Sequence, residues 1–390
     1  MKLHRVILAL ALVFALALTA CQPAAPEPAG EEPAAEEPAA ESEGPFRVAV
    51  VTPSTINDLA FSQSIYDALR AIQEERGAEN FEFVISENLF VVDDAATAIR
   101  DYASQGYDLV IAHGSQYGTS LVEIAPDFPD TPFAWGTTVD TFQDQGINNV
   151  FAYEARSEEG GYVMGVMAAM MSESNIAGVV GPVETGDAKL YVDGFEAGFL
   201  AQNPDGRVNK NYIGSFSDVA LAAEAANTHI QGGADILTGS AQMVVGAVGV
   251  AEENGVLWFA SQADQTELAP SVVVASQVYH WEVVLRDILE RIEQGQLGGQ
   301  AYAITLANGG QTIDFNPNFD IPEEVRARRR GSDRRHQGRF DHHPAAGRRV
   351  TFEITGRVPG FALAPALWEA VVRRAGPTCR LTPVDASSRG

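Results

Sequence analysis

Short, almost continuous apolar runs alternate with helical stretches from residue 46 onward. The runs at 46–52, 81–85 and 108–113 are each followed by a segment with helical spacing of its apolar residues. The same alternation resumes after residue 158 and continues to about residue 260. Strands that are apolar at nearly every position are buried on both faces, as in a parallel sheet that helices cover on both sides. The pattern therefore predicts an α/β chain with two lobes of similar composition.

Charge and motif content exclude several classes of function. The chain holds 26 basic and 52 acidic residues, a net charge of −26, whereas a nucleic-acid binder needs a basic face. No glycine-rich nucleotide loop, zinc-protease motif or nucleophile elbow occurs in the sequence. The two cysteines, Cys21 and Cys379, are far apart, and we expect the isolated His113, His229 and His280 to be structural. We therefore expect no cofactor, no metal, no nucleic-acid partner and no enzymatic activity.

The first 45 residues predict a lipid anchor followed by a tether. A positively charged start precedes an apolar run of 13 residues at 6–18, which suits a signal peptide better than a membrane-spanning helix. Residues 18–21 resemble the bacterial lipobox, which implies a signal peptide over 1–20 and lipidation of Cys21. Of residues 22–45, 20 of the 24 are Ala, Pro or Glu, so we expect 21–45 to stay extended and solvated. The predicted location is the extracytoplasmic face of a membrane, in the periplasm or on the cell exterior; an ordinary secretion signal is the alternative.

Several short motifs occur in an order that points to one family. The matching segments are residues 52–63, 112–117, 158–165, 193–195, 214–218 and 255–264. Together they resemble the basic-membrane-protein family, whose members are purine-nucleoside-receptor-like substrate-binding lipoproteins of ABC importers. Each motif is weak alone, but their shared order over about residues 46–320 is specific.

The resemblance implies a type I periplasmic-binding-protein fold, with two Rossmann-like lobes and parallel sheets joined by a three-stranded hinge. We expect the first lobe to comprise residues 46–155 plus 275–300 and the second to comprise 156–274 plus 301–325. Segments 301–307 and 311–315 flank an Asn-Gly-Gly turn and predict a closing hairpin. A small-molecule ligand would lie in the cleft outside the carboxyl ends of the strands. The expected partner is an ABC permease, and the expected state is a monomer.

Recognition of a purine needs aromatic plates for its two faces and a few polar groups for its rim. Phe61 and Phe216 each follow a strand end, one in each predicted lobe, so stacking on both would couple ligand binding to lobe closure. The resemblance implies that these two residues, together with Asp58 and Asp264, contact the ligand. Further candidates from the same motifs are Asn57, Ser115, Gln116 and Tyr117. Trp281 lies outside the motifs but begins a predicted helix from which it could reach the cleft.

Other roles for these residues remain open. Asp58 could serve only as a cap for the helix that follows it, because Asp is a preferred residue at helix N-termini. Phe61 could pack as a core residue, Asp264 could stabilise a turn, and Trp281 could belong to the core.

One departure from the family pattern bears on the ligand. The nucleoside-binding branch has a lysine after the strand at 272–276, whereas this chain has Gln-Val-Tyr-His-Trp at 277–281 and no lysine after Lys210. The ribose contact is therefore in doubt, and the change favours a free base or another flat heterocycle.

Three functions stay in competition. The leading one is a binding protein that delivers a purine base or nucleoside-like heterocycle to an ABC permease. The second is a membrane-tethered ligand sensor of the same fold, which genomic neighbours would distinguish. The third is a nucleoside hydrolase, which the missing catalytic motifs argue against.

The last 65 residues differ from the body in composition. Residues 326–390 hold 14 arginines, no lysine and 5 acidic residues, a net charge of +9 (14 − 5). Arg-, Pro-, Gly- and Ala-rich sequence is typical of GC-rich DNA read out of frame. A one-nucleotide shift with GC-leaning codons over 331–345 yields a segment that resembles a family C-terminus. We predict a frameshift near residue 326; a genuine basic tail that binds anionic lipid or protein is the alternative, and resequencing the locus decides between them.

Overall fold

The computed structural model describes residues 44–326. The predicted signal peptide, the Cys21 lipidation site, nearly all of the tether and the Arg-rich segment after residue 326 lie outside the described residues. Within the described part, no helix combines the length and the apolar character needed to cross a membrane.

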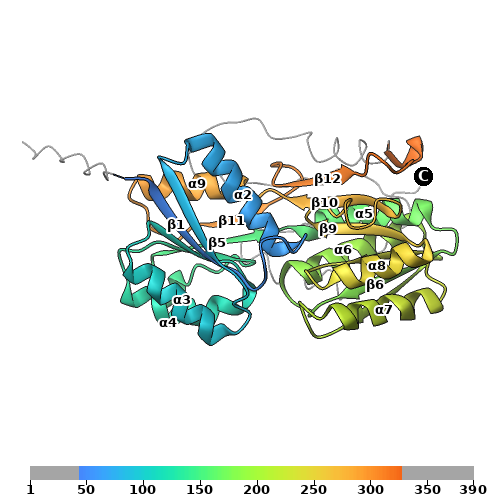
Figure 1. Ribbon diagram of the computed structural model, residues 1–390, viewed down its shortest axis with the longest axis horizontal. Coiled ribbons are helices and arrows are strands. Elements are labelled where there is room, and N and C mark those ends of the chain that lie inside the picture. The colour runs from blue at the N-terminus through green and yellow to red at the C-terminus, as the bar shows by residue number, and fades with distance from the viewer. Residues whose placement is uncertain (1–43, 327–390) are drawn as a thin grey trace, which may run out of the picture. The chain divides into compact units, whose positions relative to one another are not determined.

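The first lobe is a parallel six-stranded sheet covered by helices on both faces (Figure 1). Its strand order is β11 (Ala301–Ile304), β5 (Val150–Ala155), β4 (Phe133–Gly136), β3 (Leu109–Ala112), β1 (Phe46–Val51) and β2 (Phe81–Ser86). One face packs against α2 (Phe61–Arg76) and α9 (Glu282–Glu293). The other packs against α3 (Val92–Ser104) and α4 (Gly118–Ile124). The continuous apolar strands of the sequence are thus buried on both sides.

Helix α2 illustrates how the sequence encodes this packing. Phe61, Ile65, Leu69 and Ile72 recur at helical spacing, and all four are buried in the core between α2, α9 and the sheet. A stripe of this width is typical of a helix that covers one face of a sheet. Because Phe61 is the first residue of the helix, the same element that builds the core also delivers an aromatic ring to the carboxyl end of β1.

The second lobe repeats the architecture with one antiparallel strand. Its order is β12 (Gln311–Phe315), β10 (Val273–Tyr279), β9 (Leu257–Gln262), β8 (Ile236–Gly239), β6 (Ile176–Gly181) and β7 (Arg207–Tyr212). Helices α5 (Ser157–Met171) and α6 (Gly186–Gln202) pack on one face. Helices α7 (Val219–Gln231) and α8 (Val244–Asn254) pack on the other. Strand β12 runs antiparallel to β10, and the other pairs are parallel.

Helices α5 and α6 approach each other closely because both carry glycines at their contact. A Cβ on Gly165 would lie 2.0 Å from the backbone oxygen of Phe195, and one on Gly198 would lie 2.0 Å from that of Tyr162. Real side chains cannot reach such distances, so the run of small residues after residue 158 sets the spacing of the two helices.

The chain crosses between the lobes three times, after β5, after β10 and after β11. The expected fold is confirmed, but two details of the sequence prediction differ from the structure. Strand β10 lies in the second sheet and β11 in the first, so the crossings fall near residues 280 and 305 rather than at 275 and 301. The expected hairpin of 301–307 and 311–315 does not form, because β11 pairs with β5 and β12 pairs with β10.

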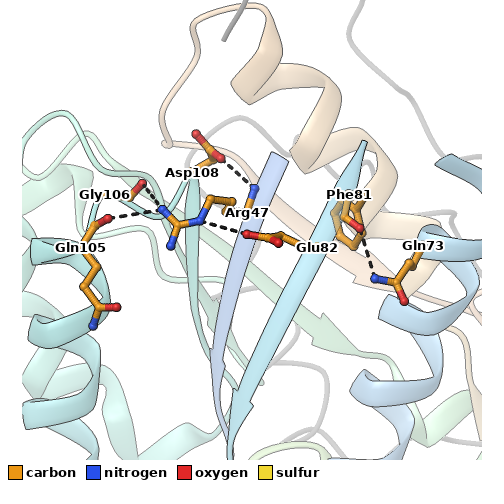
Figure 2. A network of polar contacts seen from close by, with 7 residues as sticks. All are labelled: Arg47, Gln73, Phe81, Glu82, Gln105, Gly106 and Asp108. Carbon is orange, nitrogen blue, oxygen red and sulfur yellow. Dashed lines mark hydrogen bonds and ion pairs between the residues drawn. The ribbon is translucent and has the colours of Figure 1, made fainter. Parts of the chain in front are cut away.

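A polar network fastens the amino-terminal end of the first sheet (Figure 2). The Arg47 guanidinium donates to Glu82 Oε1 at 3.1 Å and to the backbone oxygens of Gln105 and Gly106. The Arg47 backbone N–H donates to Asp108 Oδ2 at 2.7 Å. These contacts tie β1 to β2 and to the start of β3 at the end opposite to the cleft. The exposed ion pair itself adds little stability, about 0–1 kcal/mol.

Candidate ligand-binding cleft

A pocket of about 430 Å³, part of it open to solvent, lies where loops from both sheets meet. The first lobe contributes seven lining residues, which are Pro53, Phe61, Phe90, Gly114, Ser115, Gln116 and Thr137. The second lobe contributes eight, which are Thr185, Gly186, Asp187, Ala188, Phe216, Ala241, Gln242 and Gln262. They follow or end strands at the carboxyl edges of the sheets, as expected for this type of α/β fold.

Four of the residues singled out in the sequence come together here. Phe61, Ser115 and Gln116 line the pocket from the first lobe, and Phe216 lines it from the second. A third aromatic residue, Phe90, packs against Phe216, with ring centroids 6.4 Å apart and planes at 56°. Aromatic rings from both lobes therefore border one pocket.

A buried histidine supports the ring of Phe61. The rings of Phe61 and His113 are stacked, with centroids 3.9 Å apart and planes at 9°. His113 Nδ1 lies 2.7 Å from the Tyr153 hydroxyl, and its Nε2 lies 3.3 Å from the Phe61 backbone oxygen. Burial lowers the pKa of His113 to about 3, so the ring is neutral at physiological pH. His113 is thus structural, and it holds the aromatic ring of Phe61 in place.

Trp281 lies behind this stack. It is fully buried, packs edge-on against His113 and Tyr153, and donates from Nε1 to Ser64 Oγ at 2.8 Å. It does not line the pocket. The sequence left open whether Trp281 belongs to the core or to the cleft. Its contacts support the core role, since Trp281 joins α9 to α2 beneath the ring of Phe61.

The second lobe presents a polar wall. Asp187, in the first turn of α6, accepts hydrogen bonds at Oδ2 from Gln262 Nε2 (3.3 Å) and from the Tyr279 hydroxyl (3.2 Å). Gln262 Oε1 accepts from the backbone N–H of Ala241 at 3.0 Å. Burial raises the pKa of Asp187, opposed by these hydrogen bonds, so the environment favours its neutral form more than water does.

Three of the lining residues have unusual backbone conformations. Thr137, Ala241 and Gln262 have φ angles of 67°, 73° and 74°. Non-glycine residues adopt this left-handed region rarely, and β-branched ones such as Thr most rarely. Residues held in such conformations cluster at binding and active sites, where the surrounding structure imposes them. Their presence around one pocket, from both lobes, is a second sign that this pocket is a functional site.

The other candidates lie outside the pocket lining. Both carboxylate oxygens of Asp58 accept from backbone N–H groups at the start of α2, those of Ala60, Ser62 and Gln63, at 2.9–3.1 Å. This is the capping role described above. Asn57, next to it, is exposed.

Tyr117 and Asp264 also have other partners. Tyr117 is fully buried, and its hydroxyl donates to the Leu89 backbone oxygen at 2.8 Å. Asp264 is exposed and accepts from the Thr266 backbone N–H at 2.9 Å and from Ser276 Oγ at 3.2 Å. Its contacts are those of a turn.

Sequence reasoning missed the polar half of the pocket, above all Thr137, Asp187, Gln242 and Gln262. Each lies at or just beyond a strand end, after β4, β6, β8 and within the end of β9. The rule that ligands bind at the carboxyl ends of parallel strands would have found them, had it been applied to every strand. Phe90, after β2, follows the same rule.

The pocket lining includes no lysine or arginine, and its one carboxyl group is Asp187. Over residues 44–326, no group of three or more His, Cys, Asp or Glu side chains is placed to hold a metal ion. The arrangement can therefore stack a flat ring and hydrogen-bond its rim, and it offers no cation for an anionic ligand.

Comparison with known proteins relates the chain to one family. Residues 46–330 match the family described as ABC transporter substrate-binding protein, PnrA-like. A purine-binding protein of Brucella abortus is 29% identical over 261 residues, which cover 67% of this chain and 72% of the relative. A transcriptional activator of Bacillus subtilis is 27% identical over 276 residues, covering 70% of this chain and 84% of the relative.

Solved structures show the same fold. A solute-binding protein of an ABC transporter system from Conexibacter woesei superposes with a TM-score of 0.62 at 22% identity, covering 76% of this chain and 98% of its own. The arabinose-binding periplasmic protein from a Shewanella species has a TM-score of 0.52 at 18% identity, covering 76% of this chain and all of its own.

Proposed function

The chain belongs to the family of PnrA-like ABC transporter substrate-binding proteins, and from this premise we propose that it captures a neutral purine-like base between its lobes. The observation that carries the proposal is the pocket bordered by Phe61 from the first lobe and Phe216 from the second. Two aromatic residues from opposite lobes suit a flat ring and would close on it together. The purine-binding relative from Brucella abortus supports the same ligand class.

A free base fits the lining better than a nucleoside does. In the segment that carries a lysine in the nucleoside-binding branch, Gln277 is fully buried and donates to the Ser157 backbone oxygen and to Gln311 Oε1. Neither Gln277 nor any cation lines the pocket. Tyr279 reaches the pocket only indirectly, through its hydrogen bond to Asp187. A ribose would therefore find no cationic partner in the described lining.

The proposal extends to how the protein is used. Cys21 would carry the lipid that anchors it to the extracytoplasmic face of the membrane, and residues 21–45 would tether the lobes to that anchor. The lobes would act as a monomer that presents the base to an ABC permease. Mass spectrometry of the membrane-extracted protein tests the anchor, since a diacylglycerol-modified Cys21 should begin the mature chain.

A second candidate, a ligand sensor of the same fold, is favoured by one finding. The relative from Bacillus subtilis is named as a transcriptional activator and matches 70% of this chain. A permease and an ATPase encoded beside the gene would favour transport, whereas neighbouring signalling genes without a permease would favour sensing.

A thermal-shift panel tests the ligand class directly. The purified protein is melted with purine bases, purine nucleosides, riboflavin and simple sugars. A ligand at 100 times its dissociation constant adds about 2.7 kcal/mol, which moves the midpoint by several degrees. We expect shifts with free bases. A shift with sugars alone would overturn the proposed ligand class.

A further inference from the structure

We propose that Gln242 and Thr137 select the ligand by donating hydrogen bonds to a carbonyl acceptor on its rim, so that the cleft prefers an oxo-substituted base over an amino-substituted one. This inference rests on the proposed function and names the substrate class that the site takes. It assigns a specificity role to two residues that none of the sequence motifs marked.

The first observation is an unpaired donor on Gln242. Its side chain lines the pocket and is only 8% exposed, yet its Nε2 has no hydrogen-bond partner among the described residues. Buried polar atoms in native proteins nearly always have a partner, and an unpaired one costs free energy. The unpaired Gln242 N–H is explained if a bound ligand supplies the acceptor that the protein lacks.

The second observation is a hydroxyl in the same situation on the opposite lobe. Thr137 Oγ1 is buried without a partner in the described part of the chain, and Thr137 lines the same pocket. It faces the start of α6, 4.0 Å from the point where a Cβ on Gly186 would lie. The left-handed φ of 67° at Thr137 places this side chain, against the usual preference of a β-branched residue.

The neighbouring acceptors are already engaged. Gln262 Oε1 accepts from the Ala241 N–H, and Asp187 Oδ2 accepts from both Gln262 and Tyr279. This chain of contacts links Asp187 to the residue next to Gln242 and holds that part of the wall in one arrangement. Among the buried side-chain atoms of the described lining, the two left without a partner are therefore the Gln242 amide N–H donor and, across the pocket, the Thr137 hydroxyl.

The chemistry of the ligand follows from this inventory. A carbonyl oxygen has two lone pairs and can accept from both an amide N–H and a hydroxyl. An exocyclic amino group is a donor. The Thr137 hydroxyl could accept from it, but at the same place the amino group would oppose the Gln242 N–H and leave that donor unpaired. Sites built to hydrogen-bond one functional group reject the analogue that lacks it, because their buried polar groups stay unpaired.

The test compares hypoxanthine, an oxopurine, with adenine, an aminopurine, by calorimetric titration of the full chain. Gln242→Glu replaces the donor by an acceptor of the same shape, and Thr137→Val removes the hydroxyl while keeping the β-branched form. Gln105→Glu is the matched control for the added charge, because Gln105 is exposed and lies at the opposite end of the first sheet. Thr137→Ser should restore the hydroxyl and with it the binding.

We expect the wild type to prefer hypoxanthine. Gln242→Glu should reduce the hypoxanthine-to-adenine preference by about 10- to 100-fold, and Thr137→Val should weaken hypoxanthine binding by about 10-fold. The preference is a ratio within one variant, so partial loss of folding does not change it. An unchanged ratio in Gln242→Glu, or a wild type that prefers adenine, would overturn the inference while leaving the proposed function standing. A wild type that binds neither base would overturn both.

Discussion

The two walls of the cleft are built from the same fold but from different chemistry. In the first lobe, Phe61 lies on His113, and Tyr153 and Trp281 pack behind that stack. In the second lobe, Asp187 and Gln262 form a hydrogen-bonded wall. In the proposed complex, the first wall would support the face of a ring and the second would contact its rim. A doubly wound lobe thus sets where a ligand binds, while the residues at its strand ends set what that wall recognises.

Each wall also holds a buried group that could carry charge near neutral pH, His113 in the first and Asp187 in the second, and burial shifts the two pKa values in opposite directions. The pKa of His113 is lowered to about 3, and the pKa of Asp187 is raised. Both shifts favour the uncharged form of the side chain. Two walls that each disfavour charge make a cleft suited to a neutral ligand.

The largest expected effect concerns His113 and acid stability. Its pKa falls from 6.5 in the unfolded chain to about 3 in the folded one, so between these values only the unfolded chain binds the proton. The free energy of unfolding should therefore fall by about 1.4 kcal/mol for each unit that the pH drops through this window. Urea denaturation of the wild type and His113→Gln from pH 7 to pH 4 measures the difference in slope.

His229 in the second lobe is the control for this prediction. Burial lowers its pKa as well, and its Nε2 contacts the Val179 backbone oxygen at 3.1 Å, but it supports no lining ring. His229→Gln should remove a smaller part of the acid slope and leave ligand affinity unchanged. Equal slopes in the wild type and His113→Gln would show that His113 is not held neutral in the first wall.

The next effect compares the two aromatic residues. Phe61 is 7% exposed and backed by His113, whereas Phe216 lies in a loop and touches Phe90 at a tilt. Phe61→Ala should weaken base binding by about 30- to 100-fold, roughly 2–3 kcal/mol of buried aromatic contact. Phe216→Ala should cost about 10-fold, since the Phe216 ring is less buried and contributes less apolar contact. Phe61→Leu keeps the core filled, so a similar loss of base affinity in that variant would show that the aromatic ring, and not core packing, accounts for the loss. Equal losses at Phe61 and Phe216 would remove the proposed difference between the walls.

The smallest effect is the reverse pH signature of Asp187. With its pKa raised in the folded state, the folded chain binds a proton that the unfolded chain has released just above the carboxyl's ordinary pKa of 3.8. The contribution of this group to stability is therefore greatest at low pH and declines as the pH rises, by at most about 1.4 kcal/mol per unit. Asp187→Asn should remove that decline. If the variant and the wild type lose stability in parallel as the pH rises above 4, the pKa of Asp187 is not raised in the folded chain.

The sequence predicts the first wall better than the second, for a physical reason. Phe61, Ser115 and Gln116 of the first wall lie in sequence motifs that indicate a binding role, whereas Phe216 is the one residue of the second wall that a motif marked and that lines the pocket. Asp58 matches a motif equally well, yet its oxygens cap α2. Residue type alone does not separate these cases, because a carboxylate near a strand end satisfies either a helix or a ligand.

The polar wall was hidden for another reason. Asp187 lies in the first turn of a helix, and Gln242 and Gln262 are single amides in separate segments. Thr137, which faces them from the first lobe, lies in a short loop. These residues come to one pocket only because β4 of the first sheet and β6, β8 and β9 of the second all end beside it. The lobe crossings were misplaced by a few residues for a similar reason, since an apolar strand such as β10 or β11 suits either sheet equally well.

The most direct test of the account is calorimetric titration of the purified protein with hypoxanthine and with its nucleoside, inosine. A cleft that stacks a neutral base and offers no cation to a ribose should bind hypoxanthine at least about 10-fold more tightly than inosine, a difference of about 1.4 kcal/mol. Tighter binding of inosine, or no binding of either compound, would contradict the claim that these two unlike walls were built around a free base.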